Sequence, residues 1–196
     1  MKPITEVRRI RAPFARPQGL AWDGAVFWMS SVATDRIYAV DPRSWTVKWE
    51  TAAPGKPWGL CVLREELRVV CGEGPADNRF IHRCVPYRGF DASGRMPCPD
   101  DCGSHLSWDG ARLQLSQWYP RKLLALDENG TVGRTIPLDH EVCGQTWVDG
   151  KFFLVTTDDE RTTDYWLTRL EPGTGAAARS ADLARIPFAA RALAFD

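Results

Sequence analysis

Two short segments of the sequence each place a histidine three residues from a cysteine. Cys102 and His105 lie in PDDCGSH, and His140 and Cys143 lie in DHEVCGQ, where Glu141 follows the histidine. Sulfur and imidazole suit zinc, so the first candidate is a zinc site of Cys102, His105, His140 and Cys143. Without a metal, histidine beside a carboxylate or thiol could transfer protons or activate a nucleophile, which makes His105, His140, Glu141 and Cys143 the candidate catalytic residues. A third interpretation is structural, with buried cysteines and hydrogen-bonded histidines.

A second group of side chains suits binding. Arginine can hold a carboxylate or phosphate through two parallel hydrogen bonds, and an aromatic ring can stack on a ring or sugar. The candidate ligand-binding residues are Arg16, Gln18, Lys56, Trp58, Glu73, Trp118, Tyr119, Gln145 and Arg191. Together they favour a small polar or anionic molecule.

Both groups occupy fixed places in a repeated pattern. The phrases GLAWDGAVFWMS, SHLSWDGARLQLS and TWVDGKFFLVT each put an Asp-Gly pair between two runs of strand-forming residues, which indicates a β-hairpin. The mean period of about 43 residues is typical of propeller blades with four strands each. The repeats cover approximately residues 19–58, 59–104, 105–145 and 146–191.

The pattern predicts an all-β protein with a single domain over residues 1–196. We expect a small β-propeller of four or five blades, each with mostly four antiparallel strands. TEVRRIRAPFARPQGL aligns without gaps with WTVKWETAAPGKPWGL, so residues 5–12 should supply a closing fourth strand and the C-terminal RALAFD a first strand. Such strands would close the ring and remove exposed edges. The alternatives are a ring completed by a second copy and a two-sheet sandwich.

The segment PQGLAWDGAVFWMSSVATDRIYAVDPRSWTVKWE resembles the β-propeller superfamily of NHL repeats, gluconolactonase-like hydrolases, virginiamycin B lyase and glutamine cyclotransferase. The shared features are a Pro-x-Gly-Leu start, the Asp-Gly hairpin, an aromatic second strand and a third strand that ends in Val-Asp-Pro. The resemblance implies the propeller fold. It transfers no catalytic residue, because this fold carries lyases, lactonases, transferases and scaffolds alike.

The predicted fold also selects one face for function. Loops between second and third strands, and between successive blades, share one face, and here they are long and polar. Function concentrates on loops held by a rigid scaffold. We therefore expect His105 and His140 to converge with the binding residues at the mouth of the central tunnel on this long-loop face.

Composition limits the partners. Lys plus Arg and Asp plus Glu each total 25, so the basic surplus typical of nucleic-acid binding is absent. No apolar run approaches the ~20 residues of a membrane-spanning helix, and MKPITEVRRIRAPF lacks the apolar centre of a secretion signal. We predict a cytoplasmic protein without a nucleic-acid or membrane partner, with free cysteines and with homo-oligomerisation left open.

These expectations combine into one predicted function. The protein should bind a small polar or anionic molecule at the tunnel mouth, and lyase or hydrolase activity would follow if the histidine segments react. No cofactor other than the zinc alternative is expected. The alternative function is a non-catalytic scaffold for protein–protein interaction or self-assembly.

Overall fold

The computed structural model describes residues 1–173 and 178–195 and contains four antiparallel sheets of four strands each. Blade 1 consists of β1 (Pro17–Trp22), β2 (Phe27–Ser31), β3 (Arg36–Val40) and β4 (Val47–Ala52). Blade 2 consists of β5 (Lys56–Leu63), β6 (Glu66–Glu73), β7 (Asn78–Val85) and β8 (Gly89–Pro97). Blade 3 consists of β9 (Leu106–Trp108), β10 (Leu113–Gln117), β11 (Lys122–Leu126) and β12 (Val132–Pro137). Blade 4 consists of β13 (Glu141–Val148), β14 (Lys151–Thr157), β15 (Tyr165–Pro172) and β16 (Ala178–Ile186).

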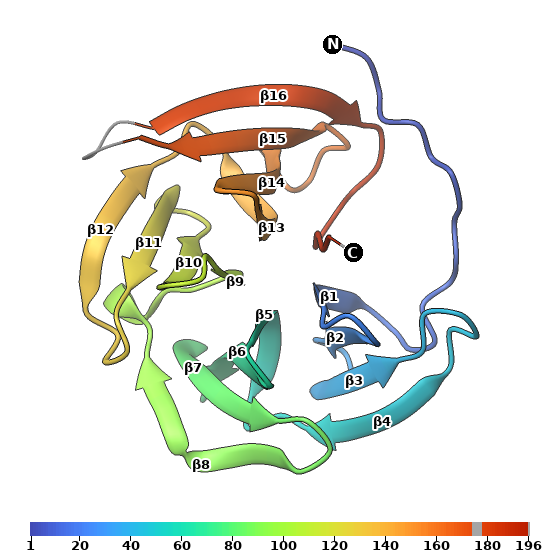
Figure 1. Ribbon diagram of the computed structural model, residues 1–196, viewed down its shortest axis with the longest axis vertical. Coiled ribbons are helices and arrows are strands. Elements are labelled where there is room, and N and C mark those ends of the chain that lie inside the picture. The colour runs from blue at the N-terminus through green and yellow to red at the C-terminus, as the bar shows by residue number, and fades with distance from the viewer. Residues whose placement is uncertain (174–177, 196) are drawn as a thin grey trace.

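The blades stand around a common axis, with β1, β5, β9 and β13 on the inside and β4, β8, β12 and β16 on the outside (Figure 1). A single turn of 3-10 helix, η1 (Pro99–Asp101), connects blades 2 and 3. This arrangement confirms the predicted all-β propeller and excludes the two-sheet sandwich. Within residues 1–173 and 178–195, no helix has the length and apolar character needed to span a bilayer.

The repeated Asp-Gly pair forms two kinds of turn. In blade 4, Val148 pairs with Lys151, so Asp149 and Gly150 are the whole loop, and both have positive φ (48° and 78°). That is the two-residue turn expected from Asp-Gly. In blades 1 and 3 the loops are longer, and the aspartate carboxylate accepts backbone N–H groups instead; Asp109 Oδ1 accepts from Ala111 at 2.8 Å and Arg112 at 2.6 Å.

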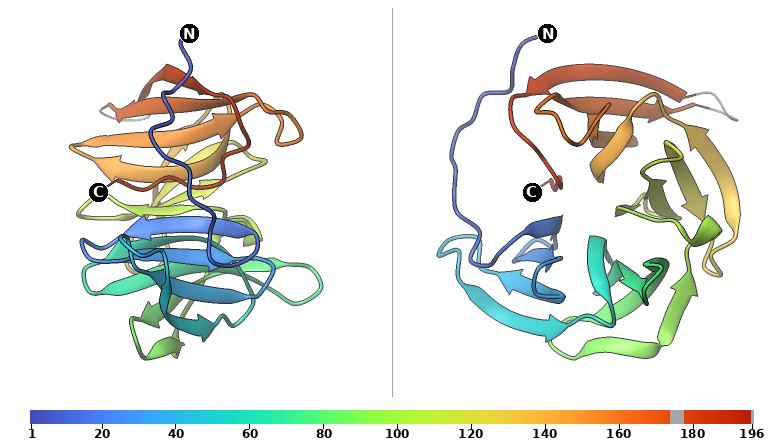
Figure 2. Two further views of the ribbon diagram at one scale, coloured as in Figure 1. Left: turned by 90° about the vertical axis from the view of Figure 1, so that its right-hand side faces the viewer. Right: turned by 180° about the vertical axis from the view of Figure 1, so that it is seen from behind.

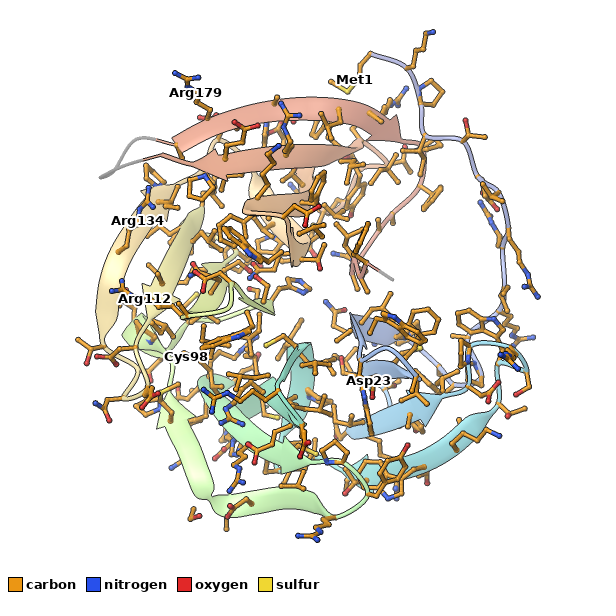
Figure 3. The ribbon with its side chains drawn as sticks, viewed as in Figure 1. Met1, Asp23, Cys98, Arg112, Arg134 and Arg179 are labelled. Carbon is orange, nitrogen blue, oxygen red and sulfur yellow. The ribbon has the colours of Figure 1, made fainter. Side chains whose placement is uncertain are left out.

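Apolar side chains fill the spaces between neighbouring blades (Figure 3). Ile37 and Ala39 of β3 pack against blade 2, together with Trp28, whose side chain is 1% exposed. The middle strands are covered on both faces, so β10 is buried along its whole length. Burial of each large apolar side chain contributes roughly 2–3 kcal/mol. All six cysteines are free, and five of them are buried.

The ring is bridged by the chain termini between blades 4 and 1. Contacts join β1 to β5, β5 to β9 and β9 to β13. In the remaining sector, the N-terminal segment runs along the outside and the C-terminal segment along the inside (Figure 2). The inner segment can approach blade 4 closely because residue 144 is glycine. A Cβ on Gly144 would lie only 2.7 Å from Cα of Ala192.

The terminal segments differ from the strands that the sequence predicts. Residues 5–12 form no β-ladder, and the only pairing of the described N-terminus is a bridge between Pro3 and Arg185. Residues 187–195 also lack a ladder. In every complete blade, the second and third strands lie between the first and the fourth. The two terminal segments correspond to a first and a fourth strand without the two strands between them. The two segments therefore have no neighbouring strand with which to pair.

Candidate functional site

The long-loop end of the tunnel opens into a cavity of about 710 Å³. Its walls come from residues that lead into the inner strands and from the loops that follow the second strands. The sequence-predicted residues that line it are Arg16, Gln18, Lys56, Trp58, Cys102, Trp118, Tyr119 and Arg191. The structure therefore brings together most of the binding group at one opening.

Trp58 and Arg79 form one wall of this cavity. The Arg79 guanidinium lies 4.1 Å from the centroid of the Trp58 ring. Nη2 of Arg79 donates to Asp77 Oδ2 at 2.7 Å, and Nη1 donates to the carbonyl of Gly103 at 2.9 Å. These bonds fix the arginine and connect blade 2 to the segment that leads into blade 3.

Trp118 and Arg191 form another wall. The Arg191 guanidinium lies 5.6 Å from the Trp118 ring centroid, and its Nη1 donates to Glu160 Oε2 at 3.0 Å. The indole N–H of Trp118 donates to Glu141 Oε2 at 2.6 Å. Glu141 thus holds the tryptophan in place from behind and does not line the cavity.

Two cations at the cavity have no counter-charge. Within the described chain, no carboxylate oxygen lies within 4.0 Å of the side-chain nitrogens of Arg16 or Lys56. Among the carboxylates that line the cavity, Asp77 and Glu160 are paired with Arg79 and Arg191. Asp101 has no such partner in the described residues. Because the pairs cancel, the remaining charge of the lining is positive.

His105 lies beneath the cavity and not on its wall. Its side chain is 4% exposed, and its ring centroid is 6.5 Å from that of Trp118. Burial, together with the positive charges of Arg191 and Arg79, lowers the pKa of His105 to about 3. The imidazole is therefore neutral at pH 7. Neither ring nitrogen has a hydrogen-bond partner in the described chain.

His140 does not join His105, so the predicted convergence of the two histidines is wrong. Nδ1 of His140 lies 2.7 Å from Asp158 Oδ1, and the ring stacks on Trp166 with centroids 5.2 Å apart. The imidazole lines a separate cavity of about 290 Å³ against blade 4. The carboxylate and the indole hold it over the sheet and away from the tunnel mouth.

Cys102 and Cys143 lie in separate surroundings, and the pKa of each thiol is raised. Cys143 is fully buried with Val155 and Tyr165, and burial raises the pKa of its thiol. Cys102 is partly exposed at the cavity, and burial raises its pKa as well. In residues 1–173 and 178–195, no three side chains of His, Cys, Asp or Glu gather to hold a metal ion. The structure therefore does not assemble the predicted zinc set.

Two predicted binding residues lie elsewhere. Gln145 is buried and donates to Ser107 Oγ at 3.0 Å and to the Gln114 carbonyl at 2.8 Å, which joins blades 3 and 4. Glu73 accepts from Arg95 at 3.0 Å and lies 2.7 Å from His82 Nε2, within blade 2. Both side chains connect strands and contribute nothing to the cavity wall.

Arg79 and Glu160 belong to the cavity but are absent from the sequence-based set. Arg79 lies in the third strand of its repeat, where alternation predicts packing. A weak signal existed, because Arg36 and Lys122 begin the third strands of two other repeats. Glu160 lies in the charged loop TDDERTTD, which composition alone describes as solvent-exposed.

Comparisons with known proteins give the fold. No protein-family model and no curated sequence matches the chain. Glutaminyl cyclase from Myxococcus xanthus is similar in structure, with a TM-score of 0.62 and 17% identity over 85% of this chain and 73% of that one. A streptogramin B lyase structure gives 0.56 and 18% over 89% and 57%. The PQQ-bound aldose sugar dehydrogenase of Streptomyces coelicolor gives 0.55 and 14% over 96% and 87%.

The chain is a β-propeller. The resemblance that the repeats indicate is confirmed at the level of the fold, and similar propellers include a cyclase, a lyase and a dehydrogenase. At these identities the likeness extends to the fold alone. The chain also spans less than two thirds of the streptogramin B lyase structure. What this propeller does has to be argued from its own cavity.

Proposed function

We propose that this propeller binds a small anionic molecule at the mouth of its tunnel. The observation that carries the proposal is the pair Arg16 and Lys56, two cations without counter-charges that line one cavity of about 710 Å³. Cavities of ~300–1,000 Å³ are the size that holds small-molecule ligands. Charge-assisted hydrogen bonds to an oxyanion would satisfy both cations at once.

Aromatic side chains support the same proposal. Arg79 covers one face of the Trp58 ring and Arg191 lies over Trp118, so these indoles hold cations at the wall. Tyr119 is 79% exposed at the rim and offers an uncovered ring to the apolar part of a ligand. Binding of an anion requires no catalytic residue. None of His105, His140, Glu141 and Cys143 lines the cavity, and lyase or hydrolase activity is therefore not proposed.

Isothermal titration calorimetry with inorganic phosphate and with acetate tests the proposal. The double variant Arg16→Gln/Lys56→Gln should bind at least about tenfold more weakly than the wild type, because charged hydrogen bonds contribute ~1.5–3 kcal/mol. The matched control is Arg64→Gln/Arg88→Gln, which removes the same charge from turns on the opposite face. Equal affinity of both double variants, or no binding by the wild type, would overturn the proposal.

A second candidate function is self-assembly, and the sector between blades 4 and 1 favours it. Residues 5–12 and 187–195 lie there without β-ladders. Tyr38 and Val40 of β3 belong to a cluster on the face opposite to the one that packs on blade 2, and Phe14 of the N-terminal segment covers Tyr38 with centroids 3.9 Å apart. Backbone without a ladder partner can accept strands from another chain. We propose a second copy of this chain as that partner.

A further inference from the structure

The cavity has a third cationic side chain besides Arg16 and Lys56 that could hold a ligand. Arg191 uses only Nη1 in its bond to Glu160, and its other nitrogens have no acceptor in the described chain. Arg79 differs, since its Nε, Nη1 and Nη2 all donate to protein oxygens. Arg191 is therefore oriented by Glu160 and Trp118 but retains N–H groups for a ligand.

The blades define the two sides. Arg16 precedes β1 and Lys56 begins β5, so these cations belong to blades 1 and 2. The two residues that hold Arg191 follow second strands of the other blades, Trp118 after β10 and Glu160 after β14. Blades 3 and 4 face blades 1 and 2 across the axis (Figure 1). Arg191 is therefore held by side chains of blades 3 and 4 and adds guanidinium N–H donors to the two unpaired cations of blades 1 and 2.

We propose that the ligand is a two-ended anion, with one acidic group held by Arg16 and Lys56 and the other by Arg191. This inference rests on the proposed function and specifies its ligand class. The acidic groups are carboxylates, or one carboxylate and one phosphate, since guanidinium binds both in the same way. One cavity of about 710 Å³ thus offers donors from two pairs of blades to a single ligand.

The other residues of the lining determine which chemical groups the ligand can carry between its two acidic groups. Asp101 lines the cavity without a cationic partner in the described residues, so a third negative group there would be repelled. His105 lies below as a buried neutral imidazole without a hydrogen-bond partner. Gln18 and Ser104 add neutral polar groups to the lining. The centre of the molecule should therefore carry no further negative charge, and a hydroxyl or amide would be accommodated there.

Calorimetry with a length series tests the inference. The probes are α,ω-dicarboxylates from succinate to suberate, monocarboxylates of equal length, and 4-phosphonobutanoate. The best dicarboxylate should bind wild-type protein at least about tenfold more tightly than its monocarboxylate, the effect of one added charged contact. Stronger binding of the phosphonate at equal length would identify a phosphate as one of the two ends.

Variants locate the second end. Arg191→Gln should abolish the advantage of the dicarboxylate over the monocarboxylate, whereas Arg191→Lys should retain part of it. The matched control is Arg179→Gln, an exposed cation on β16 away from the cavity. A thermal melt of each variant checks that it folds, because Arg191 also contacts Glu160.

The outcomes separate this inference from the function on which it rests. Equal binding of mono- and dicarboxylates, still dependent on Arg16 and Lys56, would overturn the two-ended ligand and leave anion binding intact. An advantage that persists in Arg191→Gln would do the same. Absence of binding by every probe would overturn both.

Discussion

His105 shows how much a single side chain depends on its surroundings. An exposed histidine titrates near neutral pH, but here burial and two nearby guanidiniums keep the imidazole neutral. A proton-transfer role at pH 7 would require the group to accept and release protons in that range. Its place under Trp118 instead makes it part of the floor of the cavity.

The same residue predicts acid sensitivity. The folded-state pKa of about 3 lies below the unfolded value of 6.5, so below pH 6.5 only the unfolded state takes up this proton. The free energy of unfolding should therefore fall as the pH drops from 6.5 toward 3, by up to about 1.4 kcal/mol per pH unit. About one pH unit above 6.5 this contribution becomes constant. Urea unfolding at pH 7.5, 6.5 and 5.5 measures the slope.

The control for this prediction is His105→Gln, which removes the titrating group. Its stability should change less between pH 6.5 and 5.5 than that of the wild type. His82, whose pKa is also lowered mainly by burial, remains in both proteins and contributes equally. Parallel losses in the two proteins would show that His105 does not cause the slope.

At the scale of elements, the Asp-Gly hairpins determine where blades 1, 3 and 4 fold back between their first and second strands. The four-residue turns of blades 1 and 3 place an aspartate oxygen under successive N–H groups. The second oxygen of Asp109 accepts from Gln114 Nε2 at 2.7 Å. The carboxylate therefore substitutes for the backbone acceptors that a tighter turn would provide.

Replacing Asp109 tests this contribution. Asp109→Ala should lower the free energy of unfolding by ~1–2 kcal/mol, because the N–H groups of Ala111 and Arg112 lose their acceptor. Asp109→Asn keeps an acceptor oxygen and should lose clearly less. Guanidinium unfolding curves of both variants provide the comparison, and equal losses would assign the effect to something other than the acceptor.

At the scale of the whole molecule, the ring differs between its sectors. Three inter-blade spaces are closed by contacts between inner strands, and the fourth is bridged by terminal segments without ladders. The outer segment carries Val7, which is 94% exposed. This sector is therefore the place where a second copy would add strands.

Self-assembly through this sector has a direct test. Native mass spectrometry across a concentration series should show a dimer, and Val7→Pro should reduce it because proline removes a backbone donor from the outer segment. Val7→Ala removes the side chain but keeps the N–H and should dimerise like the wild type. A wild-type protein that stays monomeric at every concentration would contradict this candidate function.

Repeats and turn chemistry are local, and they were sufficient to predict the propeller and the face that carries the cavity. Hairpins, strand alternation and the spacing of about 43 residues involve neighbours along the chain, so they can be recognised without coordinates. Arg16, Lys56, Trp58 and Trp118 were found for the same reason, because each holds a recurring place relative to its strand.

Only the tertiary structure decided which side chains face one another. His105 and His140 both precede inner strands, yet Asp158 and Trp166 draw one imidazole over blade 4 while burial removes the other from the wall. Arg79 reaches the cavity through bonds to Asp77 and Gly103 that no periodicity records. Side-chain direction and pKa depend on partners far away in the sequence, and those partners become neighbours only when the ring has formed.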